Sequence, residues 1–314
     1  MLKCIRQKRM KIIILMSTYN GTKYLREQLD SIYNLDNIGD ISILVRDDGS
    51  KDGTQDILEE YKRSHDNFDW YQGENLRPAR SFWQLMKVAP DADFYAYADQ
   101  DDVWDKDKLV IATKALEPFD KKTPLLYFSD VRVVRADLSL MYKKMIQTNM
   151  PIDFPHSLIK NVCPGCTYVF NKAARDIALK FDPDIYELDI HDWAMHRIVA
   201  CFGHIVLDRT AHMSYRQHGN NVIGANRNGI FGRIIETLKK SKNPKFVNLR
   251  LRNARAFEEC YANDMNPENR YTVYLLAHYI EDKKLMKAVL KDPRFKFGFM
   301  EYTYFKWRIR SGKF

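Results

Sequence analysis

The chain has 314 residues, which is long enough for one large α/β domain with an appendage or for two small domains. Hydrophobic residues make up 45% of it and charged residues 29%, a composition that excludes a disordered or low-complexity protein. The formal net charge of +9 indicates an anionic partner, such as nucleic acid, a nucleotide or a membrane surface.

Hydrophobic runs and cysteines indicate the cellular compartment in which the protein works. No apolar run reaches the roughly 20 residues that cross a bilayer, and no apolar segment of secretory length follows the basic residues at the start. We therefore expect a cytoplasmic protein, or one held peripherally on the inner face of the cell membrane. The five widely spaced cysteines argue against a disulfide framework. Cys163 and Cys166 have CxxC spacing without a second ligand pair for zinc, so we interpret them as semi-buried thiols in a turn.

The first hundred residues alternate between strand and helix patterns. Short apolar runs predict strands at residues 11–16, 41–45, 68–71 and 94–98, and helical spacing predicts helices at 22–33, 54–61 and 81–88. Such alternation is typical of a doubly wound, mostly parallel α/β sheet. In these sheets, ligands bind beyond the carboxyl ends of the strands.

The pattern loosens in the rest of the chain. Strands are predicted at residues 125–128, 131–134, within 161–171 and at 205–207, with a helix at 192–201. After about residue 229 the sequence becomes basic, with helices predicted at 234–240, 249–261, 271–282 and 285–290. We therefore divide the chain into an α/β domain at 1–228 and a helical C-terminal region at 229–314.

Polar side chains follow three of the predicted strands at the points where those strands end. Thr18 follows the first strand, Asp47 and Asp48 follow the second, and the acidic turn of residues 99–102 follows a later one. Because the carboxyl ends of parallel strands share one edge of the sheet, we expect these groups to converge on one crevice.

The acidic turn is suited to a divalent cation. Asp99 and Asp101 are two residues apart and can both face one hard cation. Mg²⁺ or Mn²⁺ commonly keeps one or two protein carboxylates and takes its other ligands from phosphate oxygens and water, which predicts a nucleoside diphosphate as ligand. The alternative is a solvated turn in which Asp102 caps a helix. Asp47 and Asp48 favour the cation, because like charges gathered at one edge need compensation.

Fingerprints of two other nucleotide-binding classes are missing from the sequence. Residues 17–21 contain one glycine where the dinucleotide-binding fingerprint needs three, and the chain has no P-loop lysine pattern. These features argue against a Rossmann dehydrogenase and against a P-loop kinase.

Two motifs in the second half could add chemistry. A carboxylate at the start of a helix is stabilised by the helix dipole, so Asp192 could stay ionised as a base, and the alternative is a simple N-cap. Residues 214–221 read as a polar loop after a strand. There Arg216 could bind phosphate and His218 could ligate the cation, and the alternative is a surface loop with a solvated histidine.

Taken together, these motifs resemble the family-2 inverting glycosyltransferases of GT-A fold, most of all a bacterial rhamnosyltransferase-like branch that builds cell-surface polysaccharides. The matching segments occur in the family's order: MSTYNG at 16–21, RDDGSKDGT at 46–54, ADQDDVW at 98–104, HDW at 191–193 and YRQHGNN at 215–221. The resemblance spans roughly residues 11–224 and implies a GT-A catalytic domain at 1–228.

The resemblance implies a role for each matching residue. Thr18 and Asp47 would contact the nucleotide, with Asp48 close by. Asp99 and Asp101 match the family's DxD motif and would hold Mn²⁺ or Mg²⁺, with Asp101 in direct contact and His218 as a third ligand. Asp192 matches the catalytic base, although the family often has Glu where this chain has His191. The other expected donor- or acceptor-binding residues are motif neighbours, namely Tyr19, Asn20, Gln100, Trp193 and Arg216.

The implied reaction moves a sugar from a nucleotide-diphospho-sugar to a hydroxyl of a saccharide acceptor. The resemblance suggests dTDP-rhamnose as the first choice of donor, with transfer of rhamnose. The second choice is a UDP-sugar, with transfer of a hexose. The acceptor would be a growing, lipid-linked cell-surface polysaccharide. A single displacement inverts the anomeric configuration and needs no second carboxylate as nucleophile.

Three alternatives stay open on the sequence. Aromatic and basic residues interleave in the tail at 294–313, which could lie on an anionic membrane or could form a helical cap over the catalytic domain. The charge of +9 could indicate a nucleic-acid-binding protein, but the predicted strand ends are acidic, so we expect no nucleic acid partner. A nucleotidyltransferase would also use carboxylates and a divalent ion, but its glycine-rich basic loop after the first strand is missing.

Overall fold

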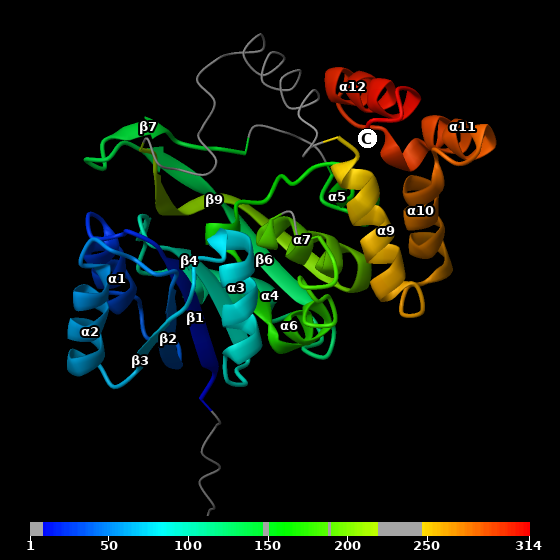
Figure 1. Ribbon diagram of the computed structural model, residues 1–314. Helices are drawn as coiled ribbons and strands as arrows, with labels where there is room; N and C mark the ends of the chain where they lie inside the picture. Colours follow the sequence, from blue (N-terminus) through cyan, green and yellow to red (C-terminus); the bar gives the residue numbers. More distant parts are fainter. Residues whose placement is uncertain (1–8, 147–150, 188–189, 219–246) are drawn as a thin grey trace, which may run out of the picture.

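The centre of the molecule is a mixed β-sheet (Figure 1). The computed structural model describes residues 9–146, 151–187, 190–218 and 247–314. Within these residues the sheet has nine strands in the order β3-β2-β1-β4-β8-β6-β9-β5, with β7 paired to β6. The strands are β1 (Lys11–Thr18), β2 (Asp40–Asp47), β3 (Phe68–Gln72), β4 (Phe94–Asp99), β5 (Val103–Trp104), β6 (Leu125–Val134), β7 (Leu140–Tyr142), β8 (Val169–Asn171) and β9 (His204–Arg216).

Strand β1 is the middle of the parallel half of the sheet. It pairs in parallel with β2 on one side and with β4 on the other. The register sets Thr18 opposite Asp47 and Ser17 opposite Asp99. The polar groups at the ends of three strands therefore lie along one edge, as the sequence predicts.

Helices cover both faces of the sheet. The side chains of β1 alternate, so that Ile12 and Ile14 pack under α1, α2 and α4, whereas Ile13 and Leu15 pack under α3, α6 and α7. These helices are α1 (Leu25–Tyr33), α2 (Thr54–Ser64), α3 (Arg77–Val88), α4 (Lys108–Leu116), α6 (Lys172–Ala178) and α7 (His191–Phe202). The predicted α/β fold is confirmed.

The structure differs from the sequence predictions in several elements. Helices α4 and α6 were not predicted, and the two strands predicted at 125–128 and 131–134 form the single strand β6. Residues 214–216 belong to β9, so the polar loop predicted at 214–221 is wrong for its first three residues. The cause is tertiary: β9 is held between β6 and β5, with Ser214 opposite Val103, and this pairing satisfies its backbone despite the polar side chains.

The C-terminal region forms a helical layer beside α5 (Phe154–Ser157) and α7 (Figure 1). It contains α9 (Leu249–Tyr261), α10 (Pro267–His278), α11 (Lys283–Lys291), the 3₁₀ turn η2 (Pro293–Phe295) and α12 (Phe299–Arg310). Phe295, Phe305, Ile309 and Phe314 are buried in the shared core, as the helical-cap alternative requires. The predicted helix at 234–240 and the predicted domain boundary at 228/229 lie outside the described residues. Along the described part of the chain, no helix has both the length and the hydrophobicity needed to span a membrane.

A buried histidine joins the two regions. The Nδ1 atom of His156 lies 2.5 Å from Asp153 Oδ1, and its Nε2 atom lies 3.1 Å from the carbonyl oxygen of Lys296. Both partners are hydrogen-bond acceptors, an arrangement that favours the doubly protonated ring. Burial lowers the pKa of His156, but the hydrogen bonds to Asp153 and Lys296 outweigh burial and raise it overall.

Candidate active site

The ends of β1 and β2 are tied together around one buried carboxylate. The hydroxyl of Thr18 donates to Asp47 Oδ1 over 3.0 Å. Ser50 donates to the same carboxylate through its backbone N–H and its hydroxyl, and Gln55 donates through Nε2 at 3.0 Å. Neither Thr18 nor Asp47 is more than 1% exposed. The carboxylate is therefore fixed in one orientation at the edge of the sheet.

The neighbouring Asp48 has a different partner. It forms a buried ion pair with Arg46, whose guanidinium also donates to the carbonyl of Glu74 at 2.9 Å and to the hydroxyl of Ser81 at 3.2 Å. Asp48 thus lies next to Asp47 along the chain, but its carboxylate is held by the protein beneath the edge of the sheet.

The loop after β1 bridges the ends of β2 and β4. The backbone N–H of Tyr19 donates to Gln100 Oε1 at 2.9 Å, and Gln100 Nε2 donates back to the Tyr19 carbonyl at 3.1 Å. Asn20 has a φ of 50°, which asparagine tolerates well, and its N–H donates to the Ser50 hydroxyl at 2.8 Å. Tyr19 is 49% exposed, so its side chain faces solvent while its backbone is fixed.

The carboxylates that follow β4 crowd one another. Burial first, and then the negative charges of Asp101 and Asp192, raise the pKa of Asp99 to about 7. Burial, followed by the charges of Asp101 and Asp99, raises the pKa of Asp102 well above its usual range. Such a group of like charges favours a bound cation, because a cation lowers the cost of keeping the carboxylates ionised.

The donor set at this edge fits Mg²⁺ or Mn²⁺. Asp99 and Asp101 offer hard carboxylate oxygens, and the imidazole of His218 lies with Nε2 2.6 Å from Asp101 Oδ2. Fully buried Asp102 accepts the backbone N–H of Arg216 at 3.1 Å through Oδ1, and its Oδ2 has no hydrogen-bond partner among the described residues.

The sequence analysis did not assign Cys166 to this site. Ligand atoms of Asp99, Asp102 and Cys166 lie within 4.8 Å of one another, so the thiol faces the acidic turn. Burial raises the pKa of Cys166 well above its usual range, which keeps the group a thiol. Cys166 is 5% exposed and thus more buried than the semi-buried thiol that the sequence predicts, and the CxxC spacing gave no sign of its carboxylate neighbours.

Lys108 on α4 is a second residue that the sequence analysis missed. Its side chain is fully buried, with Nζ donating to the Cys166 carbonyl at 2.7 Å and lying 3.6 Å from the centre of the Trp104 ring. Burial lowers its pKa to about 8. Lysine rarely lies inside a protein, so a helical pattern alone assigns it to the surface.

Asp192 lies in the first turn of α7, and its negative charge contributes to the raised pKa of Asp99. The N–H of Trp193 donates to Asp192 Oδ1 at 2.6 Å, and the hydroxyl of Tyr168 donates to the Asp192 carbonyl at 3.1 Å. The indole of Trp193 is buried and donates to the Ser157 carbonyl at 2.5 Å. Asp192 and Asp99, about ninety positions apart in the chain, are therefore close enough for their charges to interact.

The structure accounts for the histidine that precedes Asp192. The ring of His191 stacks on Phe82 at 4.2 Å and meets Tyr97 edge-on at 5.0 Å. Burial lowers the pKa of His191 to about 3, so the ring is neutral. His191 thus acts here as an aromatic packing residue and places no charge beside Asp192.

Arg216 lies beneath the acidic turn. It is 2% exposed, and its guanidinium contacts Glu27, the carbonyl of Ala136 and, at 2.8 Å, the carbonyl of Asp101. These contacts hold the backbone that carries Asp101. The last three residues of the motif at 215–221 lie outside the described residues.

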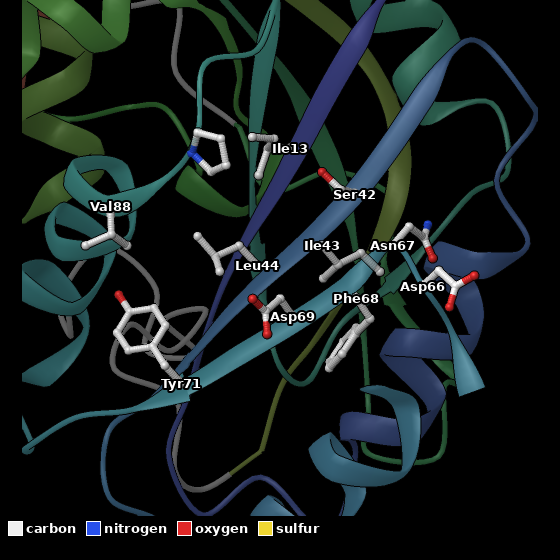
Figure 2. A pocket seen from close by; sticks show the side chains of 11 residues that line it. Ile13, Ser42, Ile43, Leu44, Asp66, Asn67, Phe68, Asp69, Tyr71 and Val88 are labelled. Carbon is white, nitrogen blue, oxygen red and sulfur yellow. The ribbon is translucent and has the colours of Figure 1, made fainter. Parts of the chain in front are cut away.

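A cavity of about 420 Å³ lies away from this edge (Figure 2). Figure 2 shows Leu44 and Tyr71 on the neighbouring strands β2 and β3, with Val88 from the end of α3 nearby. The cavity contains none of the candidate site residues.

Comparisons with known proteins find sequences and a fold similar to those of this chain. The family model described as "Glycosyl transferase family 2" matches residues 13–177. The chain is 32% identical over 228 residues to the dTDP-rhamnosyl transferase RfbG of Shigella flexneri, which covers 67% of this chain and 74% of that protein. It is 32% identical over 132 residues to the abequosyltransferase RfbV of Salmonella typhimurium, covering 41% and 38% of the two chains. The crystal structure of S. aureus TarS 1-349 in complex with UDP-GlcNAc has a similar fold, with a TM-score of 0.54, 15% identity and coverage of 97% and 93%.

Proposed function

Because the chain belongs to glycosyltransferase family 2, and is therefore a glycosyltransferase, we propose that it uses a nucleoside-diphospho-sugar and inverts the anomeric centre during transfer. The observation that supports this proposal is the charge interaction of Asp99, the last residue of β4, with both Asp101 and Asp192. We propose dTDP-rhamnose as the donor, supported by the printed activity of the Shigella relative, with a UDP-hexose as the alternative.

Asp192 supplies the base. Its carboxylate takes the proton from the acceptor hydroxyl while that oxygen attacks the anomeric carbon from the face opposite the leaving group. The N–H of Trp193 fixes one carboxylate oxygen and thereby sets the orientation of the base. One displacement inverts the configuration, so no second carboxylate needs to act as a nucleophile.

Asp99 and Asp101 would hold the divalent cation, with His218 beside them. A bound Mn²⁺ or Mg²⁺ supplies Lewis-acid stabilisation of the charge that grows on the departing diphosphate. Arg216 supports this site from beneath through its contact with the Asp101 carbonyl.

The nucleoside end of the donor would lie along β1 and β2. Thr18 and Asp47 form one rigid hydrogen-bonded unit, and the loop of Tyr19 and Asn20 borders it. Because Thr18 and Asp47 are at most 1% exposed, they would hold this loop in place for contact with a base and ribose, with little ordering cost on binding.

A thermal-shift panel tests the donor and the metal together. We expect dTDP and UDP to raise the melting temperature only when Mn²⁺ is present, and the preferred base to give the larger shift. A ligand at a hundred times its Kd stabilises the native state by about 2.7 kcal/mol. If no nucleoside diphosphate shifts the melting temperature with or without Mn²⁺, the proposed donor class is wrong.

We also propose that the acceptor is lipid-linked and that α12 rests on the membrane that carries it. The outer face of α12 consists of Phe299, Thr303, Trp307 and Arg310, which are all exposed and share one side of the helix. Phe299 is 86% exposed and Trp307 is 42% exposed. Aromatic side chains beside basic ones are typical of helices that lie in the interface of an anionic bilayer.

Vesicle flotation tests this surface without disturbing the helical core. The double variant Phe299→Ser and Trp307→Ser should bind vesicles containing phosphatidylglycerol at least about tenfold more weakly, because burying one large apolar side chain contributes roughly 1.5–3 kcal/mol. Tyr271→Ser, which changes an exposed aromatic residue on α10, is the matched control and should float like the parent protein. Unchanged flotation of the double variant, or equal binding to neutral vesicles, contradicts the membrane role.

A further inference from the structure

The 3₁₀ turn η1 (Gly165–Thr167) lies between the two halves of the candidate site. At Gly165, a Cβ atom would lie 2.7 Å from the Cβ of Asp192 and 3.0 Å from its Oδ2. Real Cβ atoms essentially never approach other atoms as closely as 2.7 Å. Asp192 therefore packs directly against the backbone of the turn, and only a hydrogen atom fits at this position.

The next residue of the turn contacts the acidic half of the site. The carbonyl oxygen of Cys166 accepts a hydrogen bond from the ammonium group of Lys108 at 2.7 Å. Its thiol faces Asp99 and Asp102, with the three ligand atoms within 4.8 Å of one another. Consecutive residues of one turn thus touch the proposed base on one side and the proposed metal-binding strand end on the other.

The turn is itself rigid. The hydroxyl of Thr167 donates to the Pro164 carbonyl at 2.7 Å and accepts the N–H of Ser129 at 3.2 Å. Tyr168 follows at once, with its N–H bonded to the Gly165 carbonyl at 2.9 Å. Its hydroxyl reaches across to the Asp192 carbonyl at 3.1 Å. The turn has little freedom to absorb a displacement at either end.

We propose that η1 is a spacer that sets the distance between Asp192 and the acidic end of β4, with Gly165 as the positioning residue for Asp192. The proposal rests on the proposed role of Asp192 as base. A base must reach the acceptor hydroxyl while the donor is held at the other half of the site. A misplacement of about 1 Å can cost about 100-fold in rate, so the packing at Gly165 matters to the chemistry and not only to stability.

Gly165→Ala is the direct test. The added methyl group pushes Asp192 away, so we expect kcat to fall about 100-fold. The KM for the donor and the calorimetric affinity for UDP or dTDP with Mn²⁺ should stay within about twofold, because the proposed nucleotide contacts are on β1, β2 and β4. Tyr168→Phe keeps the side-chain volume and removes only the hydroxyl that holds the Asp192 carbonyl. This variant should also lower kcat, by a smaller factor, while the KM for the donor and the nucleotide affinity stay unchanged.

Cys201→Ala is the matched control for a loss of packing. Cys201 is buried near the opposite end of α7, so this variant should lower the melting temperature and leave kcat unchanged. The stoichiometry of nucleotide binding counts the folded sites in each variant. The proposal is overturned if kcat falls only in proportion to the loss of nucleotide-binding sites. It is also overturned if kcat stays at the parent value in both Gly165→Ala and Tyr168→Phe. If Asp192→Asn retains transfer, Asp192 is not the base and the proposed function fails. This outcome is distinct from a failure of the spacer proposal, which the Gly165 and Tyr168 variants test.

Discussion

Asp192→Asn should abolish sugar transfer and leave donor binding nearly intact. The asparagine side chain has almost the same shape but cannot take a proton, so the attacking hydroxyl loses its base. General-base catalysis contributes about 10²–10⁴-fold, and we expect kcat to fall within or beyond that range. Donor binding should persist, because Asp192 acts on the acceptor and the nucleotide contacts are assigned to β1, β2 and β4.

Single-turnover assays measure the expected loss of transfer, and calorimetry measures the expected retention of nucleotide binding. Asp176→Asn is the matched control, since Asp176 is an exposed carboxylate on α6 that pairs with Lys172. The control should behave like the parent protein, because exposed ion pairs contribute about 1 kcal/mol or less. Normal turnover by purified Asp192→Asn would remove the base assignment.

Asp101→Ala should also abolish transfer, but by a different route. Asp101 is one of the two carboxylates of the DxD pair and the neighbour of His218. Its loss should weaken Mn²⁺ binding and with it the metal-dependent binding of the nucleoside diphosphate. A metal ion contributes several kcal/mol of transition-state stabilisation, which corresponds to a rate loss of about 10³-fold or more.

The two variants separate in a binding measurement. Asp192→Asn should keep the Mn²⁺-dependent thermal shift with UDP or dTDP, whereas Asp101→Ala should lose it. Asp69→Ala serves as the control, because Asp69 is an exposed carboxylate that pairs with Lys62 on the surface. If Asp101→Ala keeps the full Mn²⁺-dependent shift, Asp101 does not hold the cation.

Family membership decides between the alternatives that the sequence left open. The chain is a glycosyltransferase, which sets aside the nucleotidyltransferase and the nucleic-acid-binding protein. The net charge of +9 misleads on this point, because the groups gathered at the strand ends are acidic. Net charge describes the whole surface and carries no information on the sign of the charge at one site.

The departure at His191 illustrates how a motif can change while its central residue remains. The family often has a second carboxylate at this position. Here the ring is neutral and packs against Phe82 and Tyr97, so it fills space at the helix start without adding a charge. Asp192, the second residue of α7, therefore has an uncharged neighbour.

The sequence by itself determined the α/β fold and the edge of the sheet that carries the site. This succeeds because strand and helix patterns are local, and because parallel strands place their carboxyl ends on the same side. Thr18, Asp47 and Asp99 are the last residues of the parallel strands β1, β2 and β4, so their place along one edge was predictable once these strands were recognised as parallel.

Only the tertiary structure decided what surrounds those residues. Lys108 looks like a surface lysine, Cys166 like an ordinary thiol and Arg216 like a loop residue, yet all three are buried against the acidic turn. Their partners lie far away in the chain, as in the contact between Arg216 and the Asp101 carbonyl. Local patterns report which face of an element is apolar, but the burial of a charged side chain depends on whether distant segments supply its counter-charges and acceptors, and only the folded chain brings these together.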